Sequence, residues 1–181
     1  FTFRINADTV HSEQDYQNYV SLKDYKRAIQ LALAMAQPGR LLNLFNRVYE
    51  SRDGKSITGS AEVDAVIDTL SAKDLVRLLK FVRDWNTKAK TSGVAQRILE
   101  AIVRNKSPNE LVRMFEVASS KHAEVEEDVV EPNVEAEAEP AKRPRATTAD
   151  LISLQDLLDG LLPYTERHLN RIERTLVDSY M

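Results

Sequence analysis

Residues 24–49 read DYKRAIQLALAMAQPGRLLNLFNRVY, and the apolar residues in this stretch predict two helices that meet at a proline. Before the proline, apolar side chains recur at three- and four-residue steps, which is the period of a helix face, and they cover most of the helix surface. Pro38 cannot continue the first helix without the loss of a backbone donor, but its fixed φ suits the first turn of a second helix. A helical pair this apolar needs neighbours, so we expect the other segments to cover it.

Capping signals place further helices on both sides of this pair. Ser12, Ser60 and Ser71 each precede an apolar pattern of helical period. Ser107 is followed by a proline at the first helical position and by a glutamate that can close a capping box. Together these patterns predict roughly nine helices arranged in hairpins. We therefore expect an all-α fold, an irregular α-solenoid-like stack of helical hairpins, since no strict repeat is visible.

The two ends of the chain carry less regular patterns. Residues 1–10 alternate weakly between apolar and polar, which predicts a short strand or an extended segment. Because the chain starts at Phe1 rather than Met, we expect residues 1–11 to lead in from an upstream domain. Near the other end, Gly160 can end a short apolar helix and Pro163 can start a last one. The inner face of that last helix is expected to carry Tyr164, Leu169, Ile172, Leu176 and Tyr180.

One internal segment differs from the rest of the chain in composition. Residues 122–148 hold eight acidic and three basic residues, a balance of −5, so the remainder carries +2 of the total of −3. Large apolar side chains are too scarce there to repay the entropy of ordering the segment. We therefore expect one helical domain, formed by residues 12–121 and by two last helices in 149–181. Residues 122–148 are expected to be a disordered acidic and basic insert.

Composition and motifs exclude several classes of protein. The chain of 181 residues has no cysteine, which excludes disulfides and thiolate metal sites and fits a reducing compartment. No apolar run reaches the ~18 residues of a membrane span, so we expect no membrane partner. The sequence contains no phosphate-binding glycine loop, no nucleophile elbow and no His-Glu-x-x-His motif. We therefore expect a protein that is not an enzyme and binds no metal or cofactor.

Two conspicuous aromatic residues are interpreted as packing residues. His168 lies beside the apolar face of the last predicted helix, where a packing histidine is favoured over a catalytic one. Trp85, the one tryptophan, ends an apolar stripe. This position favours a core anchor, with an exposed hot spot for a partner as the alternative.

Two small basic groups are candidates for contact with RNA. Lys88 and Lys90 lie in a predicted loop, and three arginines share one face of the last helix, opposite its apolar side: Arg167, Arg171 and Arg174. Acidic residues are interleaved with both groups, and the chain outside residues 122–148 is nearly neutral. A solvated surface is therefore favoured over a phosphate-binding stripe.

A protein-binding surface is the competing interpretation. The predicted helices at 25–36 and 151–158 are apolar on more than one face, and a folded body of this size can leave part of that surface uncovered. Helical domains with such a face commonly present it to another protein. The last helix is a candidate edge for this contact, through Leu169, Ile172, Leu176 and Tyr180.

Three stretches of the sequence resemble a known family. They are EQ at 13–14 leading to DYKRAIQLAL at 24–33 with QP at 37–38, VRDWNTK at 82–88, and LLPYTERH at 161–168. They are similar to the C-terminal helical domain of the thirteenth U-three small nucleolar RNA-associated proteins, the transducin-β-like WD-repeat subunits of the UTP-B complex in the small-subunit processome. The resemblance spans residues 13–181, and the second and third stretches are its specific part. The insert at 122–148 is longer than expected for this family.

The resemblance implies a nucleolar, non-enzymatic scaffold that acts in small ribosomal subunit biogenesis and pre-rRNA processing. In that family the domain follows two WD-repeat β-propellers and would bind the C-terminal helical domain of another WD-repeat UTP-B subunit, beside other processome proteins. Direct contact with pre-rRNA or the U-three RNA, through the five basic candidates, is the alternative. The near-neutral charge and the lack of an aromatic stacking platform favour the assembly role.

Overall fold

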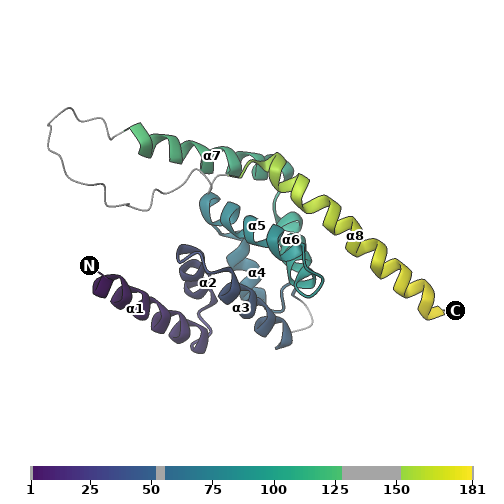
Figure 1. Ribbon diagram of the computed structural model, residues 1–181, viewed down its shortest axis with the longest axis horizontal. Coiled ribbons are helices and arrows are strands. Elements are labelled where there is room, and N and C mark those ends of the chain that lie inside the picture. Colours follow the sequence, from purple (N-terminus) through teal and green to yellow (C-terminus); the bar gives the residue numbers. More distant parts are fainter. Residues whose placement is uncertain (1, 52–55, 128–151, 181) are drawn as a thin grey trace.

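The computed structural model describes residues 2–51, 56–127 and 152–180, and within them the chain is helical throughout its regular structure (Figure 1). The eight helices are α1 (Thr2–Ser21), α2 (Tyr25–Ala34), α3 (Pro38–Glu50), α4 (Ala61–Asp68), α5 (Ala72–Asn86), α6 (Ser92–Asn105), α7 (Pro108–Glu127) and α8 (Leu154–Tyr180). The expected all-α class is confirmed, with one helix fewer than predicted because the last two are a single helix. None of the described helices is both long and apolar enough to cross a membrane.

The helical pair predicted around Pro38 forms as expected. Asp24 caps α2 by accepting a hydrogen bond from the backbone N–H of Arg27 at 3.1 Å. The turn between α2 and α3 passes through Ala36, whose φ is +50°, and Pro38 opens α3. Both helices bury the apolar face that the sequence pattern predicts: Ala28, Ile29, Ala32 and Leu33 from α2, and Leu41, Leu44, Phe45 and Val48 from α3.

The prediction of a strand or extended segment over residues 1–10 is wrong, because α1 already begins at Thr2. Ser12, expected to cap the first helix, lies inside it. The physical reason is that residues 1–23 contain neither glycine nor proline, so nothing in them stops the helix from extending backward. The predicted break after Ser21 is confirmed, and Lys23 takes up the turn with a φ of +58°.

The centre of the body is α5, which contacts α2, α6, α7 and α8. Ser71 caps α5 by accepting from the backbone N–H of Asp74 at 3.2 Å, and its hydroxyl donates to the Asp74 carboxylate at 2.8 Å. Trp85 is buried at the other end, with its ring 6.3 Å from that of Phe45, so it is the core anchor that the sequence favoured. Since contacts also join α2 to α4 and α4 to α6, the solenoid-like order of the hairpins stays a prediction.

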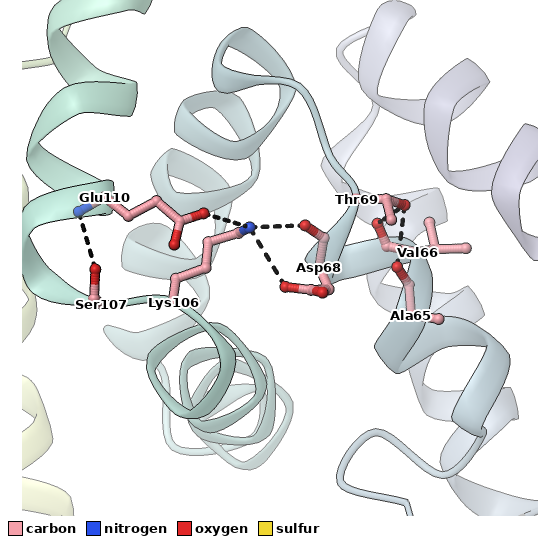
Figure 2. A network of polar contacts seen from close by, with 7 residues as sticks. All are labelled: Ala65, Val66, Asp68, Thr69, Lys106, Ser107 and Glu110. Carbon is pink, nitrogen blue, oxygen red and sulfur yellow. Dashed lines mark hydrogen bonds and ion pairs between the residues drawn. The ribbon is translucent and has the colours of Figure 1, made fainter.

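A buried lysine joins three helices at the start of α7 (Figure 2). The side chain of Lys106 is only 4% exposed, and its Nζ donates to the backbone carbonyl of Asp68 at 2.7 Å, at the end of α4. The same nitrogen lies 3.4 Å from the Glu110 carboxylate and 3.5 Å from that of Asp68. The ammonium thus pairs with a helix-end carbonyl, which otherwise lacks a donor, and ties α4 to α7. Sequence analysis did not identify this lysine.

The two helices predicted in 149–181 are one continuous helix, α8, so the predicted break between Gly160 and Pro163 is wrong. Gly160 is helical and lies against α5, where an added Cβ would stand 2.7 Å from Cδ of Arg83. Pro163 removes one backbone hydrogen bond without changing the helical φ, and the packing of α8 on α5 offsets that loss. Of the expected insert, residues 122–127 extend α7, and residues 128–148 lie outside the described residues.

Candidate functional site

The first half of α8 is fixed to the body by apolar side chains. Leu157, Leu161 and His168 are buried, and α8 packs on α5. Ser153 caps this end by accepting from the backbone N–H of Asp156 at 3.0 Å. The predicted apolar helix near residue 151 therefore exists, but it is the base of a longer helix.

A buried polar network holds this base in one register. The side chain of Asn86, at the end of α5, is fully buried and donates to the carbonyl of Leu161 at 3.2 Å and to the hydroxyl of Thr165 at 3.0 Å. Gln96, from α6, donates to Oδ1 of Asn86 at 2.9 Å and to the Thr165 hydroxyl at 3.0 Å. Thr165 in turn donates to the Leu161 carbonyl at 2.9 Å. With the two bonds that it accepts from Asn86 and Gln96, the Thr165 hydroxyl thus uses its one donor and both of its acceptor positions. A network satisfied in this way specifies a single docking geometry.

His168 completes the network. Its Nε2 lies 2.7 Å from the backbone carbonyl of Asn86, and because a carbonyl can only accept, Nε2 carries the proton and donates. The histidine is buried and is held by a structural hydrogen bond. The interpretation of His168 as a packing residue fits this position. The network lies within two of the stretches that carry the family resemblance, since VRDWNTK supplies Asn86, and LLPYTERH supplies Leu161, Thr165 and His168.

Beyond His168, α8 leaves the body, and Figure 1 shows its C-terminal part extending away from the other helices. Every described residue from 169 to 180 is exposed. The prediction that four apolar residues of this half face inward is therefore wrong within this chain: Leu169, Ile172, Leu176 and Tyr180 are 54–88% exposed. The sequence period identified an apolar face correctly but not what covers it.

Exposed apolar side chains on α8 form one stripe, interrupted only at the half-buried Thr165, which we call the α8 seam: Leu158, Leu162, Leu169, Ile172 and Leu176. Their spacing alternates between four and three residues, with Thr165 filling the one polar position, which is the spacing of a two-helix packing seam. Of the eleven large apolar side chains that are exposed in the described part of the chain, seven lie on α8. The concentration on one helix marks this surface as unusual for a monomer.

The basic candidates lie outside the seam. Arg167, Arg171 and Arg174 are exposed on another face of α8, around a shallow depression that they share with Pro163, Glu166 and Asn170. Lys88 and Lys90 are exposed in the loop between α5 and α6. The structure thus gathers the three arginines on one helix face and the two lysines on a separate loop.

The described residues contain no group of three His, Asp or Glu side chains placed to hold a metal ion. The strongest feature that sequence analysis missed is the network around Asn86 and Gln96. Its signal is the polar residue at the end of an otherwise apolar helix face, but the partner of such a residue on a distant helix cannot be read from periodicity.

Comparison with known proteins shows which family the sequence resembles. The family model described as the Utp13 specific WD40 associated domain matches residues 13–181. The U3 small nucleolar RNA-associated protein 13 of Saccharomyces cerevisiae is 28% identical over 180 residues, which is 95% of this chain and 18% of that protein. Transducin beta-like protein 3 of Bos taurus and of Homo sapiens are each 25% identical over 169 residues, which is 93% of this chain and 16% of those proteins.

The chain thus spans less than a fifth of the length of these relatives. The match includes all of α2 to α8, and with them both the network around Asn86 and the α8 seam. Because the family model covers nearly all of the sequence, the chain belongs to the family of Utp13 specific WD40 associated domains.

Proposed function

We propose that this chain is a non-catalytic assembly domain of a nucleolar WD-repeat protein that acts in small ribosomal subunit biogenesis and pre-rRNA processing. Its membership of the Utp13 specific WD40 associated domain family supports this role, as does the yeast relative named for its association with the U3 small nucleolar RNA. In this proposal the chain works within the UTP-B complex of the small-subunit processome, where it contacts other processome proteins.

The contact itself is assigned to the α8 seam and to Tyr180 at the end of the helix. The single observation that carries this assignment is the row of apolar side chains, each 39–55% exposed, on a helix whose other end is fixed. Covering such half-exposed side chains gains roughly 1 kcal/mol apiece. The proposed partner is the C-terminal helical domain of another WD-repeat UTP-B subunit.

Light scattering of this chain, alone and mixed with that partner domain, tests the proposal. We expect a stable mixed complex that survives ~0.5 M salt, because apolar contacts are not screened whereas surface charge pairs are. Leu169→Asp should abolish the complex. The matched control is Leu22→Asp, which changes an exposed leucine that lies before α2 and far from α8 in the sequence. A monomer that ignores the partner domain, or a complex that Leu169→Asp leaves intact, would refute the assignment.

Direct binding of RNA is the second candidate function. The observation in its favour is that Arg167, Arg171 and Arg174 are exposed on α8 outside the seam, so they remain accessible when the seam is covered. Lys88 and Lys90 would add a second contact from the neighbouring loop. Fluorescence anisotropy with a single-stranded pre-rRNA segment should then show affinity that falls steeply with salt. Unchanged affinity after all five residues are replaced by Gln would exclude this function.

A further inference from the structure

We propose which kind of helix binds to the α8 seam, and this proposal rests on the proposed assembly function. The partner is an amphipathic helix of another protein that packs alongside α8 and carries a row of Lys or Arg beside its own apolar seam. A second copy of this chain does not meet that description. The inference comes from the charges that border the seam.

One border of the seam is an acidic row. Asp159, Glu166 and Glu173 follow one another at seven-residue steps, and all three are exposed. With 100° between successive residues, seven-residue steps keep side chains on one line along the helix, and this line runs directly beside Leu162, Leu169 and Leu176. In paired helices these bordering positions face the partner's charged side chains.

The other border of the seam carries no Lys, Arg, Asp or Glu, and part of it packs on the body. Its positions are Leu161, His168 and Thr175, and the first two are buried where α8 packs on α5. Next to Leu161 and His168, a helix that covers the seam therefore meets the body on one side and the acidic row on the other. The acidic row is the border of the seam that offers charged side chains to a partner along its whole length.

Among the described residues, the three acids form no ion pair. The positions three and four residues away from each of them, where an intrahelical ion pair would form, hold only Leu, Asn, Pro, Gln, Val and one further acid. The ion pairs of the described residues do not include any of the three. Arg167, Arg171 and Arg174 lie on the adjoining face of α8, in a depression that Glu166 also lines, but no ion pair of the described residues joins them to the row. The negative charge along the seam is therefore left for an incoming partner to neutralise.

Self-pairing does not supply the missing cations. Two antiparallel copies of α8 would bring acidic rows face to face, which costs like-charge repulsion. Two parallel copies would set the acidic row against the border that contains Leu161 and His168, which has no cation and is already packed on the body. Charge complementarity therefore selects a different protein with basic residues in the facing row.

Two designed peptides of four heptads test the proposal. They share one Leu/Ile seam and differ only in the bordering residues, which are Lys in one peptide and Glu in the other. Binding to the intact chain is measured by fluorescence anisotropy at low salt. We expect the Lys peptide to bind at least about tenfold more tightly, since three attractive pairs replace three repulsive ones. The double variant Glu166→Lys/Glu173→Lys should reverse that preference.

The matched control is Asp178→Lys/Glu116→Lys, which makes the same change of net charge with exposed acids outside the row. It should leave the preference for the Lys peptide intact, and Leu169→Asp should weaken both peptides. Equal binding of the two peptides, with both weakened by Leu169→Asp, would overturn the charge inference and leave the assembly function standing. Failure of both peptides to bind, or dimerisation of the chain through α8, would overturn the proposed partner itself.

Discussion

Replacing Asn86 by alanine is expected to loosen α8 from the body. The substitution removes two hydrogen bonds that the Asn86 amide donates, to the Leu161 carbonyl and to the Thr165 hydroxyl, and one that it accepts from Gln96. The bonds have lengths of 2.9–3.2 Å and the asparagine is fully buried, so water does not replace them without entering the interface. At about 1 kcal/mol per bond, the free energy of unfolding should fall by about 3 kcal/mol.

For a chain of this size, 1 kcal/mol corresponds to roughly 2–4 °C, so Asn86→Ala should lower Tm by roughly 6–12 °C. Hydrogen exchange would show where stability is lost, with faster exchange concentrated in residues 157–168 of α8. Asn170→Ala, on the exposed face of the same helix, is the matched control and should change stability by less than about 0.5 kcal/mol.

A double-mutant cycle with Thr165→Val separates the network from simple loss of volume. Because Asn86 and Thr165 share a hydrogen bond, the two substitutions should be non-additive by at least about 0.5 kcal/mol. A loss below about 1 kcal/mol for Asn86→Ala, or strict additivity in the cycle, would refute the view that this network holds α8 in place.

Three further predictions concern the body of the domain. Lys106→Met should cost about 1–3 kcal/mol in chemical denaturation, because it leaves a helix-end carbonyl of α4 without its donor. Gly59→Ala should destabilise the chain by more than about 1 kcal/mol, since φ at this glycine is +108° and a Cβ would stand 2.7 Å from Cα of Tyr49. A Cβ at Gly39 would meet open space, so Gly39→Ala should be neutral or stabilising in the same assay. Burial raises the pKa of the Tyr16 hydroxyl above its usual 10.0. The neutral hydroxyl therefore contributes stability below pH 10, and this contribution is lost as the pH rises through the folded-state pKa. Tyr16→Phe should reduce that alkaline loss of the free energy of unfolding, measured by urea titrations at pH 8 and pH 11.

Local chemistry explains why much of the fold could be predicted from the sequence. The caps at Asp24, Ser71 and Ser107 and the helix start at Pro38 depend on residues within one turn of each other, so the pattern contains all that is needed. The strand or extended segment predicted over residues 1–10 was wrong because a weak alternation carries less information than the absence of any helix breaker.

Tertiary packing explains what could not be predicted. Gly160 and Pro163 resemble a helix end in sequence, but contact with α5 sustains one helix through both. The period of the last helix gave its apolar face correctly, although it cannot say that this face extends past the body into solvent. The basic candidates were placed on the surface as expected, while the network around Asn86 joins residues 75 and 79 positions apart and has no local signature.

The helical form of residues 169–180 also affects how quickly a partner can be captured. Starting a helix is the unfavourable step in its formation, and the docked turns from Leu157 to His168 have already taken that step for the residues that follow. The helical conformation can therefore extend from the docked turns along the exposed part, roughly 18 Å long, before any partner binds. A partner then binds a helix that is already formed. The association rate is therefore that of two folded surfaces and is not limited by the folding of an unstructured segment on contact.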